Sequence, residues 1–267
     1  MLTHGREELA RLAASCVVST ETAPDGRRTA IAQFTPAQAS ELAATYDAVL
    51  LSEVDEAMLA LLEDQGVPLR SYLLHGARDE ITRSDATELA AAAALIRAEG
   101  WDIDRMHMPN VPKMSRAKSD SGLDVVDVHL VRGRTGTDPL TDNELLRIAS
   151  VKHSVQPSSA SCIGKLRSSL SSNELSPAYV GVQLRVLHAR LIGEGYTVEE
   201  AGRVYLFLRE LHEGDHLHIV GVAVVDTTTV GDARTRIVSA LIEVPYWKVA
   251  VVIGIPDLGN LHELCSS

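Results

Sequence analysis

The chain has 267 residues, of which 45% are hydrophobic, and a formal net charge of −11. This length and apolar content suffice for one large or two modest packed domains, and they exclude a chain that is disordered by composition. The acidic surplus argues against a protein that binds nucleic acid through an overall basic surface. The three cysteines, Cys16, Cys162 and Cys265, are far apart, which argues against both a disulfide framework and a zinc site.

The N-terminal sequence, MLTHGREELARLAASC, is charged and amphipathic and lacks the continuous apolar core of a signal peptide. No other run of the sequence approaches the length of a membrane span. We therefore expect a cytoplasmic protein with no membrane partner.

Residues 1–80 are expected to form a mixed, mainly helical N-terminal region. Thr35 and Pro36 are typical of a helix start, because threonine caps the first turn and proline fits the first helical position. This region carries no catalytic signature, so we expect it to pack or to contact a partner. Its predicted helices and strands are Leu2–Ala14, Cys16–Ser19, Thr29–Phe34, Ala37–Ala44 and Asp55–Gln65.

The strongest predicted helix begins after Ser84 and includes Glu88 in its first turns. Its body, LAAAAALIRAEG, is rich in alanine and ends at Gly100, a residue type typical of helix C-termini. So much alanine on every face predicts close packing. A short strand over Trp101–Met108 and a basic loop over Pro109–Asp120 follow.

The next stretch predicts a β-hairpin with a long loop. Leu123–Val131 and Leu145–Val151 alternate in the manner of strands, and Arg132–Asp142 between them contains two glycines and a proline. The hairpin brings Asp124 near Lys152. A carboxylate that can hold a divalent cation beside an ammonium group that can orient water is a minimal hydrolytic site.

The remaining pattern completes an α/β domain over residues 81–267. Its last two strands read as continuous apolar runs, which is typical of strands covered on both faces. The sheet is expected to begin as a meander and to gain strands through crossover helices. The predicted helices are Ser161–Leu170, Leu175–Glu194, Val198–Leu211 and Asp232–Leu241, and the predicted strands are His218–Asp226 and Val249–Ile255.

Glu88 in the first helix, Asp124 after Gly122 at the head of the second strand, and Lys152 in Ser150-Val151-Lys152 together resemble the PD-(D/E)xK, or restriction-endonuclease-like, nuclease superfamily. The resemblance implies a mixed central sheet flanked by helices. It implies a phosphodiester hydrolase in which Asp124 and Glu88 bind Mg²⁺ or Mn²⁺ and Lys152 positions the attacking water.

More narrowly, the layout resembles the nuclease subunit of the Hachiman anti-phage defence system. That resemblance implies a metal-dependent deoxyribonuclease that acts on DNA as a bacterial defence effector. It also implies a helicase or ATPase partner, which would account for an acidic nuclease chain.

Ser150 departs from the superfamily pattern, because an acid normally stands there and completes the metal site. Some restriction endonucleases with serine at this position take the missing acid from the following helix, and Glu174 is the candidate here; Glu88 is the other. Without a replacement, the chain would be a catalytically impaired nuclease-fold subunit that binds nucleic acid or a partner protein. Each of these residues also has an ordinary structural explanation, such as a cap, a turn or a solvated strand end.

A further alternative starts from His216 and His218, which lie two residues apart at the start of a predicted strand. Two imidazoles on one face of a strand can bind a transition metal, as in a metabolic α/β enzyme. A surface pair of histidines is the commoner explanation of such a pattern.

Overall fold

The computed structural model describes six parts of the chain, and every structural statement below concerns these residues. Three sequence predictions lie outside them: the helix over Asp55–Gln65, the loop over Pro109–Asp120, and the position of Glu174. The described residues are 3–52, 79–108, 124–170, 177–210, 215–244 and 247–266.

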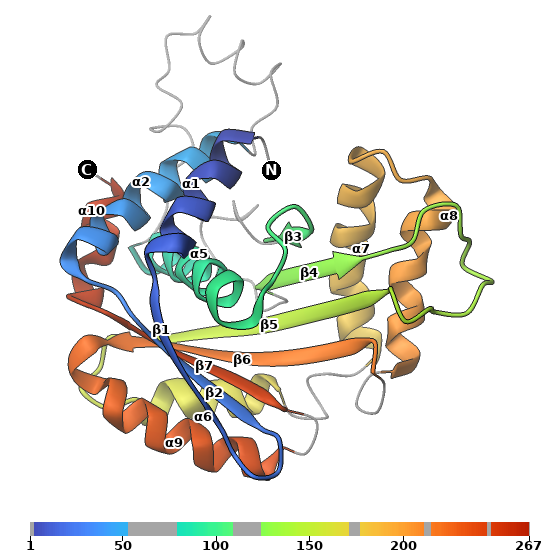
Figure 1. Cartoon of the computed structure of the whole chain (residues 1–267). Coiled ribbons are helices and arrows are strands. Elements are labelled where there is room, and N and C mark those ends of the chain that lie inside the picture. The colour runs from blue at the N-terminus through green and yellow to red at the C-terminus, as the bar shows by residue number, and fades with distance from the viewer. Residues whose placement is uncertain are drawn as a thin grey trace, which may run out of the picture.

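One mixed sheet of seven strands forms the centre of the described structure (Figure 1). Its order is β1-β2-β7-β6-β5-β4-β3; β2, β7, β6 and β5 run parallel, and the other neighbouring pairs are antiparallel. The α/β class predicted from the sequence is confirmed. The strands are β1 (Val17–Thr22), β2 (Arg28–Gln33), β3 (Met106–His107), β4 (Val125–His129), β5 (Leu145–Ser154), β6 (Leu217–Asp226) and β7 (Val249–Ile255).

Helices cover both faces of the sheet. One hydrophobic cluster joins one face to α1, α2, α5 and α10, and a second joins the other face to α6, α7, η1 and α9 (Figure 1). No helix in the described parts is long and apolar enough to cross a membrane. The α-helices are α1 (Thr3–Ser15), α2 (Pro36–Ser52), α5 (Asp79–Glu99), α6 (Ala160–Ser169), α7 (Pro177–Gly193), α8 (Val198–Ala201), α9 (Val230–Glu243) and α10 (Leu261–Ser266), and the 3₁₀ helices are η1 (Gly202–Glu210), η2 (Thr227–Thr229) and η3 (Leu258–Asn260).

The alanine-rich helix α5 is buried along its middle, as its composition predicts. Residues 85–95 are all buried, and Gly100 ends the helix with a φ of +62°, in the left-handed region that glycine adopts without strain. The predicted start was wrong, because α5 begins at Asp79 and Ser84 lies inside it. The polar residues before Ser84 continue the helix, and the described Thr82 and Asp85 are buried among its neighbours.

Two other predicted elements differ from the structure. The strand predicted over Trp101–Met108 is reduced to β3, because its first residues form turns and only Met106–His107 pairs with β4. The helix predicted over Val198–Leu211 divides into α8 and η1. Thr197 and Glu200 form a capping box that fixes the start of α8, and 3₁₀ geometry begins at Gly202.

The predicted N-terminal strands belong to the same sheet as the rest. β2 pairs in parallel with β7 from Arg28↔Val249 to Gln33↔Gly254, and β1 pairs with β2 to form an edge. The predicted domain boundary between residues 80 and 81 falls within α5, and the division into two domains stays a prediction.

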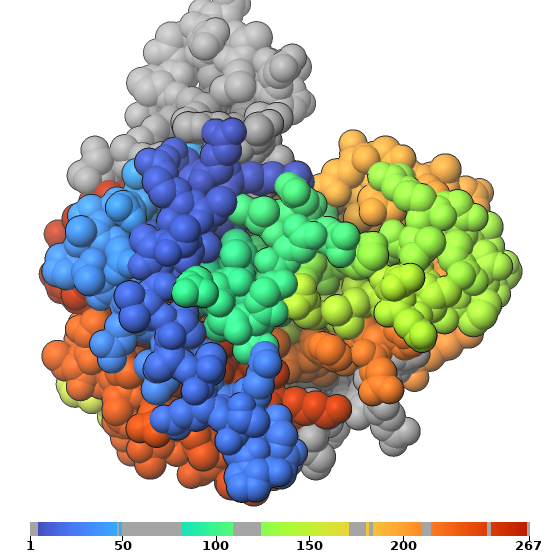
Figure 2. Space-filling model, in the orientation of Figure 1, coloured from blue at the N-terminus to red at the C-terminus, as the bar shows by residue number. Residues whose placement is uncertain are grey.

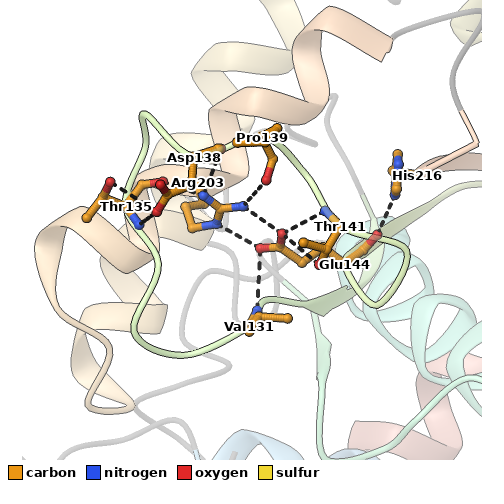
Figure 3. A network of polar contacts seen from close by, with 8 residues as sticks. All are labelled: Val131, Thr135, Asp138, Pro139, Thr141, Glu144, Arg203 and His216. Carbon is orange, nitrogen blue, oxygen red and sulfur yellow. Dashed lines mark hydrogen bonds and ion pairs between the residues drawn. The ribbon is translucent and has the colours of Figure 1, made fainter.

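A buried ion pair between Glu144 and Arg203 fastens the long β4–β5 loop to η1 (Figure 3). Both side chains are fully buried, and the Arg203 Nη2 and Glu144 Oε2 atoms are 2.6 Å apart. Arg203 also donates to the carbonyls of Asp138 and Pro139 at 3.0 and 3.2 Å. The cation therefore satisfies loop carbonyls that no strand partner reaches.

Burial alone would raise the pKa of Glu144, but hydrogen bonds from Arg203 and Thr141 outweigh it, and the net pKa is lowered from its ordinary 4.5. A carboxylate with a lowered pKa stabilises the fold above its ordinary pKa. This contribution is lost as the pH falls through the lowered pKa.

Replacing Arg203 with methionine should lower the free energy of unfolding by about 3–5 kcal/mol, because Glu144 then stays buried without its cation. Urea unfolding followed by circular dichroism measures the change. Arg209→Met, at an exposed position of the same helix, is the matched control and should change stability by less than about 0.5 kcal/mol. Equal losses in the two variants would show that the buried pair adds nothing.

Candidate active site

The hairpin brings Asp124 and Lys152 together, as the sequence predicts. Asp124 directly precedes β4, and its Oδ2 atom lies 3.5 Å from Lys152 Nζ on β5. The same oxygen accepts a hydrogen bond of 2.6 Å from the Val151 backbone N–H. The Asp124 carboxylate therefore satisfies the backbone of β5 at the point where the regular pairing of β4 ends.

Ser150 and Lys152 point to the same face of β5, because alternate residues of a strand share a face. The pairing of Val125 with Ala149, extended by one residue, sets Asp124 opposite Ser150. This is the face that α6 covers, since the Ser150 Oγ atom lies 3.0 Å from the Oγ atom of Ser169. Three side chains of the predicted site thus share one face and one end of the β4–β5 pair.

Lys152 keeps partial contact with solvent in an otherwise closed site. Its side chain is 23% exposed and that of Asp124 is 6% exposed. Lys152 Nζ also donates to the Val151 carbonyl at 3.1 Å. The ammonium group is therefore held beside the carboxylate while one side remains accessible to a ligand.

Helix α6 is fixed to the strand that carries Lys152. The Cys162 thiol donates to the Lys152 carbonyl at 3.1 Å, and burial raises the pKa of this thiol to about 12. Cys162 is thus a protonated, packed side chain at neutral pH. Its contact holds α6 against β5.

Glu88 lies at the same end of the sheet as Lys152 but in the helical layer on the other face. Arg147, at the start of β5, donates to the Glu99 and Gly100 carbonyls at the end of α5. Lys152 lies five residues after Arg147 on β5, a span of roughly 17 Å. Glu88 lies eleven residues before Glu99 on α5, which is also a span of roughly 17 Å.

The Ser84 hydroxyl donates a hydrogen bond of 3.3 Å to Glu88 Oε1. Glu88 is buried, and α5 packs on the face to which Val151 points, opposite to that of Lys152. The structure therefore brings Asp124, Ser150 and Lys152 together on one face, and Glu88 lies at the same end of the sheet in the helical layer on the other face.

Asp124 is the acid in this arrangement that suits a hard cation. In the described parts of the chain, no three His, Cys, Asp or Glu side chains gather closely enough to hold a metal ion. Mg²⁺ usually keeps several waters and is held by one or two carboxylates together with substrate phosphates. The donor set thus fits an ion shared with a phosphate, and it does not form an all-protein cage.

Asp127 has a structural role on the opposite face of β4. Arg147 Nε donates to Asp127 Oδ2 at 2.7 Å, and the guanidinium group lies 5.3 Å from the centre of the Trp101 ring. Burial raises the pKa of Asp127, and the charge of Arg147 offsets only part of this. This pair fixes the end of α5 against the sheet.

His216, one of the two histidines considered as metal ligands, contacts a backbone carbonyl. His216 Nδ1 lies 2.9 Å from the Glu144 carbonyl, within the network of Figure 3. His218 is exposed on β6, with Leu217 buried between the two. No group of three possible ligands among the described residues includes this pair.

Ser169 is the residue of this site that the sequence analysis missed. It lies at the end of α6, nine residues after the helix begins, and α6 runs back along β5. The nine residues of α6 before Ser169 span roughly 14 Å, and the four residues of β5 from Ser154 back to Ser150 span roughly 13 Å. Because the two spans are nearly equal, the predicted helix could have located Ser169 beside Ser150.

No known family model matches this sequence, and no curated protein matches it either.

Asp124→Ala should destabilise the fold by about 1–3 kcal/mol, because the Val151 N–H loses its acceptor in a buried place. Asp124→Asn should cost less, since an amide oxygen can still accept that hydrogen bond. Chemical unfolding monitored by fluorescence compares the two variants. Losses of the same size would mean that the hydrogen bond to Val151 does not support the strand end.

Proposed function

We propose that this chain is a metal-dependent nuclease that hydrolyses phosphodiester bonds in DNA. The observation that carries the proposal is the 3.5 Å approach of Asp124 Oδ2 to Lys152 Nζ, with Ser150 on the same face. The order α5, β3, β4, β5, α6, β6 supports it, because a helix, three strands, a helix and a further strand make up a restriction-endonuclease-like core. The parallel pairing of β6 with β5 agrees with this comparison.

The proposed roles follow from the chemistry of the two groups. Asp124 would hold Mg²⁺ or Mn²⁺. Glu88 and Glu174 are the acids proposed to supply the negative charge that Ser150 does not bring to the metal site. A bound cation supplies Lewis acidity toward a phosphate and lowers the pKa of water. Lys152 would orient the attacking water and offset charge on the phosphate as the bond to the leaving oxygen breaks.

We further propose that the nuclease acts in bacterial anti-phage defence with a helicase or ATPase partner. The net charge of −11 supports the need for a partner that holds DNA. Arg105 and Arg167 already have acidic neighbours: Arg105 Nε lies 3.2 Å from Asp102, and Arg167 Nη2 lies 2.5 Å from Glu243.

Lys152→Ala and Asp124→Asn should each abolish cleavage of labelled DNA in Mg²⁺ or Mn²⁺, because one removes the ammonium group and the other the metal-binding charge. Gel analysis of the products measures the loss. Lys165→Ala and Asp142→Asn are matched controls at exposed positions and should cleave like the unaltered chain. Undiminished cleavage by both site variants would overturn the assignment.

A second candidate function is a nuclease-fold subunit that binds nucleic acid or a partner protein without cutting. The observation that favours it is the Ser150–Ser169 hydroxyl pair, which stands where the superfamily has an acid and supplies no charge. A neutral hydroxyl is a weaker ligand for a hard cation than a carboxylate is.

The second candidate expects the unaltered chain, Ser150→Asp and Ser150→Glu all to leave DNA intact in Mg²⁺ and Mn²⁺, with a partner present or absent. The same cleavage assay decides this. Cleavage by the unaltered chain would contradict the second candidate outright. Cleavage by Ser150→Asp alone would instead identify a nuclease site that lacks one carboxylate.

A further inference from the structure

The hydrogen bond between the hydroxyls of Ser150 and Ser169 has a fixed direction. The Ser169 hydroxyl donates to the Leu166 carbonyl at 2.9 Å, and a carbonyl oxygen can only accept. A hydroxyl has one proton, so Ser169 has none left for its second contact, at 3.0 Å from Ser150 Oγ. Ser150 is therefore the donor of this bond, and Ser169 is the acceptor.

This direction leaves lone pairs alone on Ser150 Oγ for any further contact. Ser150 is 7% exposed, and Ser169 is its hydrogen-bond partner among the residues that the structure describes. A hydroxyl whose proton is committed in this way accepts a hydrogen bond from a ligand and does not donate one. The Ser150 side chain thus presents a neutral acceptor to the candidate site.

The acceptor on Ser150 lies beside the Asp124 carboxylate. The Asp124 N–H donates to the Ala149 carbonyl at 3.2 Å, which continues the β4–β5 pairing and sets Asp124 opposite Ser150. Opposite residues of antiparallel strands hold their Cβ atoms about 4.5–5.5 Å apart. Two neighbouring acceptors suit a ligand that donates to both, and water bound to a cation is such a donor.

The orientation of Ser150 depends on α6 and not on the helices over the other face of the sheet. Ala149 and Val151, on either side of Ser150 in β5, belong to the cluster that includes α1, α2 and α5. The blue and green atoms of these three helices pack closely together in Figure 2. Because alternate residues of a strand point to opposite faces, the Ser150 hydroxyl points away from this layer and meets Ser169 of α6.

We propose that Ser169 is a positioning residue, which holds the Ser150 hydroxyl so that it accepts a hydrogen bond from a water on the divalent cation bound by Asp124. The proposal rests on the nuclease function proposed above. Mg²⁺ keeps several of its waters in protein sites, and a neutral hydroxyl accepts from such a water more readily than it binds the ion directly. Ser150 therefore supports the hydrated ion without contacting it.

The Mn²⁺ affinity of the full chain, titrated with a short DNA duplex present and free Mn²⁺ followed by electron paramagnetic resonance, tests the proposal. Ser169→Ala should weaken Mn²⁺ binding by about 2- to 10-fold, because Ser150 can then turn its proton toward Asp124 and its hydrogen bond to the ion's water is lost. Ser169→Thr keeps the hydroxyl and should bind Mn²⁺ like the unaltered chain. Ser168→Ala, at the exposed neighbouring position of α6, is the matched control and should also leave the affinity unchanged.

A double variant separates an effect through Ser150 from a general effect on α6. Ser150→Ala should weaken Mn²⁺ binding by a similar factor, and adding Ser169→Ala to it should weaken binding no further, because Ser169 acts through Ser150. Additive losses, or full affinity in Ser169→Ala, would overturn the positioning role and leave the nuclease proposal standing. Absence of Mn²⁺ binding by the unaltered chain would overturn both.

Neutron diffraction from crystals grown in deuterated water gives a second readout that needs neither a metal nor a variant. The hydroxyl deuteron of Ser169 should point to the Leu166 carbonyl, and that of Ser150 should point to Ser169 Oγ. A Ser150 deuteron directed away from Ser169 would overturn the proposal, whatever the activity of the chain.

Discussion

The backbone pairing of β4 with β5 is the interaction on which the candidate site depends. β5 is antiparallel to β4 along one side and parallel to β6 along the other, so the sheet changes direction at this strand. Asp124 accepts the Val151 N–H where the β4 ladder ends, and the same oxygen faces Lys152. A shift of one residue in this register would turn Ser150 and Lys152 to the opposite face and separate the three side chains.

Two ion pairs hold that register from different sides. Asp127 and Arg147 join β4 to β5 and fix the end of α5, while Glu144 and Arg203 fasten the loop that connects the strands. Charges removed from water are costly unless they are paired and hydrogen-bonded. The carbonyls around Arg203 and the α5 carbonyls near Arg147 meet this condition, so the charges favour one arrangement of the hairpin over its alternatives.

Much of the fold follows from local pattern, and the parts that do not follow depend on tertiary contacts. The apolar runs that became β6 and β7 and the proximity of Asp124 to Lys152 could be predicted, because strand alternation and a loop rich in turn residues determine a hairpin. The extension of β5 to Ser154 comes from pairing with β6, and the local sequence pattern does not indicate this pairing. The contact of Ser150 with Ser169 depends on the path of α6, and the layer of Glu88 depends on which face α5 covers.

The most direct measurement is Mn²⁺ binding by electron paramagnetic resonance, with the full chain and a short DNA duplex present. The Asp124–Lys152 arrangement offers one carboxylate, so an ion shared with a DNA phosphate should depend on that charge. The account predicts that the unaltered chain reduces the free Mn²⁺ signal and that Asp124→Asn does not, while Asp142→Asn behaves like the unaltered chain. Equal Mn²⁺ binding by the unaltered chain and Asp124→Asn would contradict it.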